Sequence, residues 1–367
     1  MQYLIYLFVI LLAACSTPEE KSAEVSLRFV KEVSFDIDSM TPSFPDGNAS
    51  IFRHQGKEYY VHGNKKKFCL QFFDIQAQKF SFEVPLQREG EDGIGSFNHF
   101  FVKSLDSIYV AYSHTYSMWR VNKEGKVQQK YNWAEQLKEQ GADFVHFPGE
   151  EVLFNKDTLY FTVAYYNYPE YPVAQWICLK TGKIGLLYTL PEMYKSKTKS
   201  YRYASFMVSR CEGKNGKLIY SFQADEKLYE TDYQSKLLSP LSTVPSRYIK
   251  SILASSTIEF NPEIIAKEGT ENPRYGRVLY DAKRGLYYRV AKLASTVEDE
   301  HNYNFSIIIL NEKFEILGEH LFNKKMHLSP DLLFVSSEGL CISLLESHPS
   351  FNEDKIMFHC YVPEISK

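Results

Sequence analysis

The chain has 367 residues and a formal net charge of −3, and its acidic and basic residues are spread evenly. No basic face is present, so a nucleic-acid-binding function is not expected. Aromatic residues make up 15 % of the chain, and together with the β-branched residues they suit half-buried pleated strands, which predicts an all-β fold.

Residues 1–14 have the character of a signal peptide. The segment from Leu4 to Ala14 is almost wholly apolar, and its length of about 11 residues is too short for a helix to cross a hydrocarbon core of about 30 Å. Ala13 and Ala14 before Cys15 resemble the lipobox of bacterial lipoproteins, in which a peptidase cuts before a cysteine that carries acyl chains. We therefore expect Cys15 to be lipidated. Because no Lys or Arg precedes the apolar segment, an ordinary secretory signal with a chance cysteine is the alternative.

Residues 15–24 form a small, polar and charged stretch that cannot bury enough apolar surface to fold, so it is expected to be a flexible tether. It resembles the acidic segment that follows the lipidated cysteine in surface-exposed lipoproteins of Bacteroidetes. Ser16 in place of Asp implies, by the same kind of resemblance, the outer rather than the inner membrane. We expect an envelope protein attached to the membrane by lipid, facing either the periplasm or the surface, with its folded domain in residues 25–367.

A recurring unit organises the rest of the chain: a turn residue followed by a short run rich in Tyr, Val and Ile. Six copies stand roughly 50 to 70 residues apart, and they are "GKEYYVHG" from Gly56, "DSIYVAYS" from Asp106, "DTLYFTVAY" from Asp157, "GKLIYSFQA" from Gly216, "GLYYRVAK" from Gly285 and "GLCISLLES" from Gly339. Five of them precede a strand, a polar turn and another strand, which gives about four short antiparallel strands per unit. Units of this size repeated radially are typical of a β-propeller.

The ends of the chain predict how the ring closes. The sixth unit reaches the C-terminus before a last hairpin strand can form, whereas the segment from Val25 to Ile37 is strand-like and belongs to no unit. Pairing the two would cover an exposed sheet edge. The sequence therefore predicts a six-bladed β-propeller closed by an N-terminal strand. Long spacings at residues 132–150 and 240–275 leave room for a seventh blade, or for inserted loops and a short helix near "NWAEQLKEQ".

Cysteines and histidines give no sign of a disulfide framework or a metal site. Beyond Cys15 there are five widely spaced cysteines without a CxxC motif. Cys341 and Cys360 could lie on neighbouring strands, but buried free thiols are the favoured interpretation. The ten histidines show no metal-ligand spacing, so neither metal nor cofactor is expected.

Two stretches carry a resemblance to a known family. "REGEDGIGSFNHFFVKSLDSIYV" from Arg88 and "NPRYGRVLYDAKRGLYYRVAKL" from Asn272, together with the lipobox, resemble a family of Bacteroidetes lipoproteins of unknown function that are six-bladed β-propellers. The first stretch looks like a Gly-rich turn between blades and the second like a Tyr and Arg segment late in the chain. The resemblance implies a fold and a compartment, and no activity.

The second of these stretches is also the strongest candidate for ligand binding, through Arg274, Tyr275, Arg277, Tyr288 and Arg289. Arginine and tyrosine at the mouth of a propeller channel could hold an anionic or carbohydrate ligand by forked hydrogen bonds and ring faces. In the favoured alternative, the tyrosines fill the space between blades and the arginines bind strand ends.

Three further features have both a functional and a structural interpretation. The acidic and Gly-rich segment 89–95 could hold Ca²⁺, but a turn between blades is the better explanation. "AYYNYPEYPVAQW" from Ala164 is expected to be a loop whose tyrosines either bind a ligand or pack over a blade. Ser39, Ser107 and Thr158 lie in tripeptides that resemble the O-glycan acceptor pattern of secreted Bacteroidetes proteins.

No linear catalytic motif is present: the sequence has no GxSxG, no P-loop and no convincing Ser, His and Asp set, so no catalytic residue is named. We expect a non-enzymatic binding or interaction module with a glycan or protein ligand. One alternative is a glycan-active hydrolase or lyase whose site lies at the channel mouth. Another is a structural subunit of an envelope complex.

Overall fold

The computed structural model describes residues 24–45, 49–139, 152–162, 172–195, 201, 208–235, 237–255, 261–296 and 304–365. The predicted signal peptide, Cys15, the tether as far as residue 23 and residues 164–171 of the Tyr and Pro-rich segment lie outside these ranges. No helix within them is both long and apolar enough to span a membrane.

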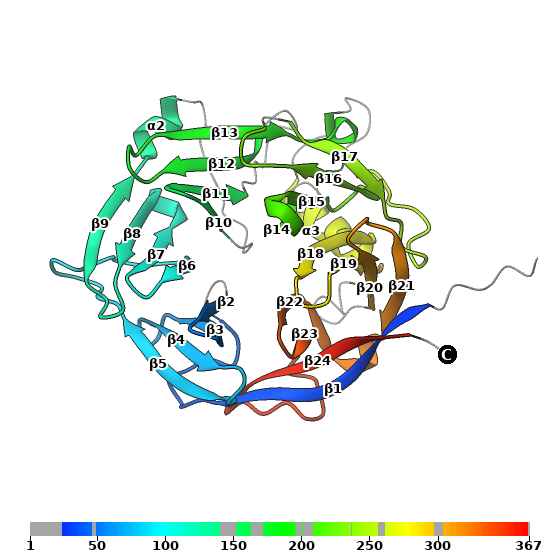
Figure 1. The fold of residues 1–367 in the computed structure, drawn as a ribbon, viewed down its shortest axis with the longest axis horizontal. Helices are drawn as coiled ribbons and strands as arrows, with labels where there is room; N and C mark the ends of the chain where they lie inside the picture. The colour runs from blue at the N-terminus through cyan, green and yellow to red at the C-terminus, as the bar shows by residue number, and fades with distance from the viewer. Residues whose placement is uncertain are drawn as a thin grey trace, which may run out of the picture.

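Six four-stranded antiparallel sheets surround a central axis as the blades of a propeller (Figure 1). In order from the innermost strand outward, blade 1 contains β2 (Ala49–His54), β3 (Lys57–Asn64), β4 (Cys69–Asp74) and β5 (Lys79–Pro85), and blade 2 contains β6 (His99–Ser104), β7 (Ser107–Tyr112), β8 (Ser117–Val121) and β9 (Val127–Asn132). Blade 3 contains β10 (Leu153–Asn155), β11 (Thr158–Thr162), β12 (Pro172–Cys178) and β13 (Ile184–Thr189), and blade 4 contains β14 (Val208–Glu212), β15 (Leu218–Phe222), β16 (Lys227–Thr231) and β17 (Ser239–Thr243). Blade 5 contains β18 (Arg274–Asp281), β19 (Leu286–Lys292), β20 (Phe305–Asn311) and β21 (Ile316–Phe322), and blade 6 contains β22 (Leu328–Ser336), β23 (Gly339–Leu344), β24 (Lys355–Ile365) and, outermost, β1 (Val25–Asp36).

The recurring Tyr, Val and Ile run is the second strand of each blade, namely β3, β7, β11, β15, β19 and β23. These strands are buried almost throughout because each is covered by the neighbouring blades on both faces, so their sequences read as continuous apolar runs. The long spacings hold the helices α2 (Ala134–Glu139) and α3 (Pro262–Glu271). The prediction of six blades is confirmed.

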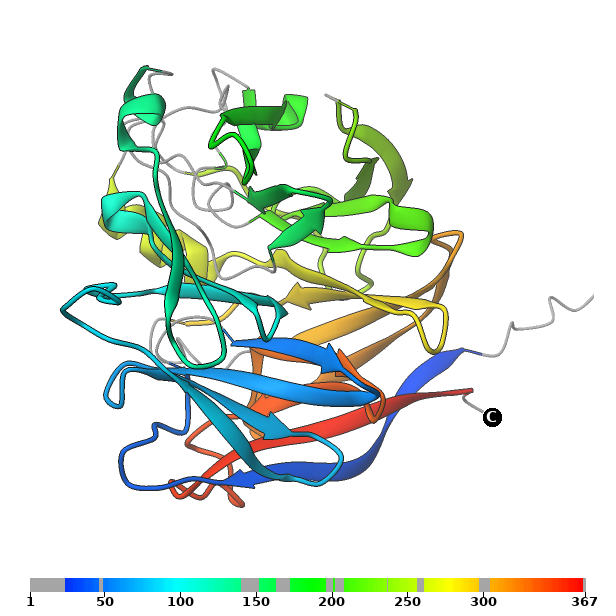
Figure 2. The same ribbon diagram turned by 60° about the vertical axis from the view of Figure 1, so that its left-hand side comes forward.

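β1 closes the ring as the outer strand of the last blade. It pairs antiparallel with β24 from Val25 opposite Ile365 to Asp36 opposite Lys355, with one bulge between Phe29 and Lys31. Figure 2 shows the two strands side by side along the edge of the molecule. The predicted N-terminal closing strand is therefore confirmed.

Each half of β1 packs into a different interface between blades. Leu27 belongs to the apolar cluster between blades 5 and 6, whereas Val33 and Phe35 belong to the cluster between blades 6 and 1. The Phe35 ring lies 5.1 Å from the ring of Phe73 and 5.9 Å from that of Tyr60, both in blade 1. One strand thus connects the last blade to both of its neighbours.

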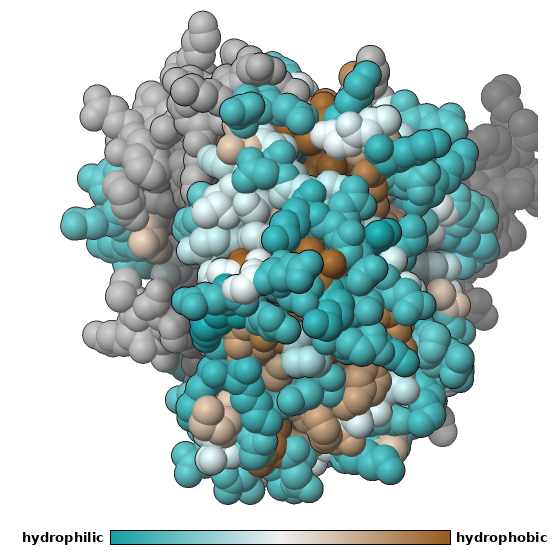
Figure 3. Space-filling model, turned by 90° about the vertical axis from the view of Figure 1, so that its left-hand side faces the viewer, coloured by the Kyte–Doolittle hydropathy of each residue, from teal (hydrophilic) through white to brown (hydrophobic). Residues whose placement is uncertain are grey.

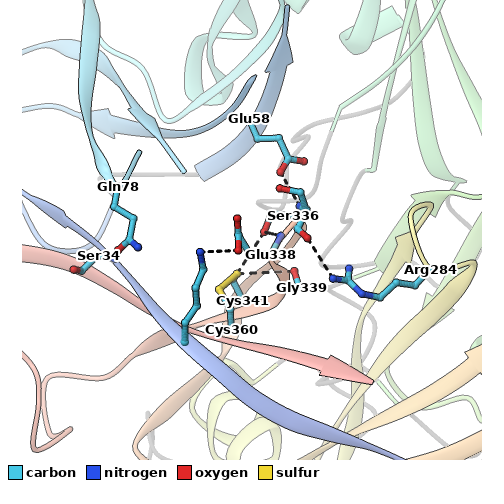
Figure 4. Close-up of a disulfide and its surroundings, with 11 residues drawn as sticks. Ser34, Glu58, Gln78, Arg284, Ser336, Glu338, Gly339, Cys341 and Cys360 are labelled. Atoms are coloured by element: carbon cyan, nitrogen blue, oxygen red, sulfur yellow. Dashed lines mark hydrogen bonds and ion pairs between the residues drawn. A yellow bond between two sulfur atoms is a disulfide. The ribbon is translucent and has the colours of Figure 1, made fainter. Parts of the chain in front are cut away.

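The structure corrects the expectation of free thiols for Cys341 and Cys360, which form a disulfide (Figure 4). The two residues lie directly opposite each other on the adjacent strands β23 and β24, a placement that brings cross-strand Cβ atoms together. The bond therefore anchors, within blade 6, the strand that holds β1.

We expect Gly318→Ala to weaken ring closure. A Cβ atom at Gly318 in β21 would lie 1.9 Å from the carbonyl oxygen of Val25, so β1 would have to move away. The free energy of unfolding, measured by chemical denaturation, should fall by roughly 1–3 kcal/mol. Gly269 in α3 has nothing within 4 Å of its Cβ position, so Gly269→Ala is the control and should be neutral or stabilising. Equal stability of the two variants would contradict this closure.

Removal of the disulfide should destabilise the fold. The bond closes a loop with a sequence separation of 19, and loops of this size stabilise by about 3 kcal/mol. Cys341→Ser with Cys360→Ser, or treatment with a reductant, should lower the melting temperature, whereas Cys178→Ser should not, because Cys178 is a partly exposed thiol. A reductant that lowers the melting temperature of the double variant as much as that of the parent would refute the assignment.

Candidate functional site in the central channel

The inner strands of blades 1, 3, 4, 5 and 6 border a cavity of about 280 Å³ on the propeller axis. In blades 4, 5 and 6 the lining residues, among them Glu212, Tyr280 and Val335, belong to the later part of each inner strand. Its apolar wall includes Ile51, Leu153, Leu279, Leu332 and Phe334, and its polar lining includes Ser50, Arg53, Tyr60, Arg210, Glu212, Arg277 and Tyr280.

The arginines of the cavity connect neighbouring blades. An innermost strand has one edge without a partner strand, and the backbone groups on that edge, which faces the axis, need other hydrogen bonds. Arg277 in blade 5 donates to the carbonyl of Leu333 in blade 6 at 2.8 Å, and Arg53 in blade 1 donates to that of Val335 at 3.2 Å. Arg210 in blade 4 also donates across a blade boundary, but its acceptor is the carbonyl of Tyr160 in β11, the second strand of blade 3.

The charge of the lining is positive, because three arginines face one glutamate. Arg53 is compensated by an ion pair with Glu58 at 2.9 Å. Burial works to raise the pKa of Glu58, but hydrogen bonds from Ser337 and Arg53 outweigh it and hold that pKa below its usual value. Arg210, by contrast, forms no ion pair with any described residue. Arg210 and Arg277, from blades 4 and 5, therefore share the lining with one carboxylate, that of Glu212.

Three buried polar atoms of the lining have no hydrogen-bond partner among the described residues. They are the Ser50 hydroxyl, the Tyr60 hydroxyl and Nε of Arg210. Tyr60 is wholly buried, and burial raises the pKa of its hydroxyl, which keeps it protonated and able to donate. Buried polar groups are nearly always satisfied in folded proteins, so such a concentration around one cavity is a candidate binding feature.

A second charged group lies toward the starts of the same inner strands. Lys292 forms an ion pair with Asp331, and Arg274 stands opposite Lys292 in the register of blade 5. Burial opposes ionisation of Asp331, but Lys292, Arg274 and Arg277 together hold its pKa below the usual value. The carboxylate is therefore ionised at neutral pH, and cations outnumber it.

The structure divides the five residues of the predicted site. Arg277 lines the cavity and Arg274 lies near the Lys292 and Asp331 pair. Tyr275, Tyr288 and Arg289 are buried and are not among the residues that line the cavity.

Arg289 shows what a fully satisfied buried arginine looks like in this fold. Its guanidinium donates to the Ser221 hydroxyl at 3.0 Å and to the carbonyls of Asp225, Glu226 and Val244. It also lies 3.8 Å from the centre of the Tyr275 ring. Burial lowers the pKa of Arg289 to about 10. This residue joins blades 4 and 5 as a structural element.

Sequence reasoning missed Ser50, Tyr60, Arg53, Arg210 and Glu212. They come from blades 1 and 4, far apart in the chain, and share no motif. One weak signal exists: Arg53 and Arg210 each stand three residues before a glycine that follows an inner strand.

The remaining sequence candidates lie on the surface. Asp92 of the acidic and Gly-rich segment accepts a hydrogen bond from the backbone of Val127 and pairs with Lys126 at 3.0 Å, which fits a turn between blades. No group of residues able to hold a metal ion occurs in the described ranges. Ser39 is exposed, and Ser107 and Thr158 are half-buried.

The comparisons with known proteins agree with this fold. A family described as a domain of unknown function, DUF4221, matches residues 25–321. The crystal structure of a DUF4221 member from Bacteroides vulgatus is similar over 94 % of this chain and 100 % of that chain, at 24 % identity and a TM-score of 0.83. A candidate exported protein from Bacteroides fragilis is similar over 96 % and 98 % of the two chains, at 9 % identity and a TM-score of 0.57. Among curated proteins, none matches the chain in sequence. The chain belongs to the DUF4221 family.

Proposed function

We propose that this protein is a non-enzymatic binding module of the cell envelope, held at the membrane by a lipid on Cys15, and that the central channel is its ligand site. The lipobox-like sequence before Cys15 supports the anchor. The observation that supports the site most strongly is the channel cavity, whose lining combines apolar residues from several blades with buried polar atoms that have no partner among the described residues.

The size of the cavity favours a small molecule. Ligand pockets for small molecules typically span about 300–1,000 Å³, and the channel cavity of about 280 Å³ lies just below that range. A polymer or a folded partner would contact only the rim, whereas a monosaccharide-sized molecule would fill the space.

The enzymatic alternative, a glycan hydrolase or lyase, has less support. Glycoside hydrolases commonly use two carboxyl groups across the scissile bond, and the cavity lining offers one, Glu212. A general acid needs a raised pKa, but among the described carboxyl groups every resolved pKa shift is downward. Glycan cleavage is therefore not proposed.

The structural-subunit alternative would be supported by a broad exposed apolar patch. Figure 3 shows the side of the propeller that carries β9, where the described residues are mostly hydrophilic and apolar atoms form small separate areas. Large exposed apolar side chains such as Phe29, Phe80 and Ile316 are distributed over the outer strands of different blades. These features favour a module that binds through its channel.

Cys15→Ala should release the protein from membranes. Without the acylated cysteine the described residues contain no membrane-spanning helix to hold it, and acyl chains contribute about 0.8 kcal/mol per buried CH₂. Fractionation after a carbonate wash measures this, with Ser16→Ala as the control that should remain bound. A Cys15→Ala protein that stays in the membrane fraction would contradict the anchor.

Filling the channel should abolish ligand binding without unfolding the propeller. Ala49 lines the cavity, so Ala49→Phe places a large side chain in it, whereas Ala77→Phe on an exposed hairpin serves as the matched control. In a thermal-shift screen of sugars, sugar acids and metabolites, a ligand at 100 times its dissociation constant stabilises by about 2.7 kcal/mol. This shift should vanish in Ala49→Phe and persist in Ala77→Phe. A shift retained by Ala49→Phe would move the site away from the channel.

A further inference from the structure

We infer that the channel cavity binds a small hydroxylated molecule carrying an oxyanion, with the oxyanion held by Arg210 and Arg277 and the hydroxyl groups by Tyr60 and Ser50. This inference rests on the proposed channel site and adds the chemical class of its ligand.

Arg210 is the residue whose surroundings most favour a bound anion. It is 2 % exposed, yet it forms no ion pair among the described residues. Its guanidinium donates to the carbonyl of Tyr160 and to the Tyr220 hydroxyl at 3.2 Å, while Nε has no partner among the described residues. A buried charge without a counter-charge is costly. Arg289, equally buried, has hydrogen bonds from all three of its guanidinium nitrogens, so the deficit at Arg210 is not a general property of arginines in this fold.

Arg277 supplies the second positive group of the same cavity. Its bond to the Leu333 carbonyl fixes the guanidinium between blades 5 and 6. Two arginines already held by backbone carbonyls lose little further side-chain freedom on binding. Guanidinium groups match carboxylates and phosphates in geometry, so either oxyanion would suit them.

Tyr60 and Ser50 supply groups that suit hydroxyls. They lie on the adjacent strands β3 and β2, and both residues are part of the cavity lining. Each hydroxyl can donate and accept, and each is shielded from water without a partner among the described residues. An unsatisfied buried polar group costs about 1–3 kcal/mol, so a ligand hydroxyl that pairs with one recovers that cost.

The apolar wall and the volume define the rest of the ligand. Leu279, Leu332 and Phe334 would face the carbon skeleton, while the space of about 280 Å³ limits its size. Sugar acids and sugar phosphates of one ring combine an oxyanion, several hydroxyls and an apolar ring face at this size.

Isothermal titration of the purified protein with four probes tests the inference. Galacturonate carries a carboxylate and glucose 6-phosphate a phosphate; galactose is the neutral control, and inorganic phosphate is an oxyanion without a sugar body. At least one of the charged sugars should bind ten or more times more tightly than galactose and than inorganic phosphate, and its affinity should fall as salt increases. Which charged sugar binds distinguishes the two oxyanions. Galactose binding as tightly as both charged sugars, or no binding of either, would overturn the inference.

Variants connect the binding to the named residues. Arg210→Gln and Arg277→Gln should each weaken the charged sugar at least tenfold, and Tyr60→Phe should weaken it severalfold with an unchanged salt dependence. Arg28→Gln removes one positive charge from the outer strand β1, where Arg28 pairs with Glu364, and should leave the affinity unchanged. Because Arg210 also connects two blades, Arg277→Gln keeps the test valid if Arg210→Gln does not fold. Normal affinity in Arg277→Gln would refute the assignment.

The outcome also separates this inference from the proposed function. A neutral ligand whose thermal shift disappears in Ala49→Phe would keep the channel as the binding site and overturn only the oxyanion. If no ligand of either kind responds to Ala49→Phe, the channel site itself is refuted.

Discussion

The pairing of β1 with β24 is the constraint on which the rest of the structure depends. A propeller is stable only when the last blade is joined to the first, because an open ring leaves apolar blade faces and a sheet edge in water. Here the first strand of the domain completes the last blade, and its side chains enter the clusters on both sides of that blade. The disulfide between Cys341 and Cys360 secures the strand to which β1 is attached (Figure 4). Closure thus combines backbone pairing, apolar burial and a covalent bond in one blade.

Closure also creates the channel and determines its chemistry. Six inner strands converge on the axis, and each leaves backbone carbonyls on its free edge. Arg53 and Arg277 donate to such carbonyls of blade 6, and Arg210 donates to a carbonyl in the second strand of blade 3. The same side chains bring positive charge to the centre of the molecule. The same set of arginines therefore has a structural role and a proposed binding role. The arginines differ in how many hydrogen bonds and ion pairs the protein provides to each guanidinium.

Much of the architecture could be predicted from the sequence, because each second strand is buried on both faces and so leaves an apolar run that recurs along the chain. The closing strand was predictable as well, since Val25 to Ile37 belonged to no unit. The disulfide was not, because the separation of Cys341 and Cys360 does not reveal that they share a register. The site was predictable only in part. Arg277 stood in a conspicuous Tyr and Arg segment, whereas Arg210 and Tyr60 reach the cavity from blades far apart in sequence. Alternation along a strand does not reveal which side chain faces the axis, so Arg289 and Tyr275 attracted a functional interpretation although they fill the space between blades.

The central claim is that Arg210, which is buried without an ion pair among the described residues, and the Tyr60 and Ser50 hydroxyls hold a ligand in the channel. The most direct measurement is a high-resolution crystal structure of the protein grown with galacturonate and, separately, with glucose 6-phosphate. We expect one of these ligands in the channel, with its oxyanion within hydrogen-bond distance of Arg210 or Arg277 and a sugar hydroxyl near Tyr60 or Ser50. A channel that holds only ordered water at saturating concentrations of both compounds, with Nε of Arg210 bonded to that water, would contradict the account.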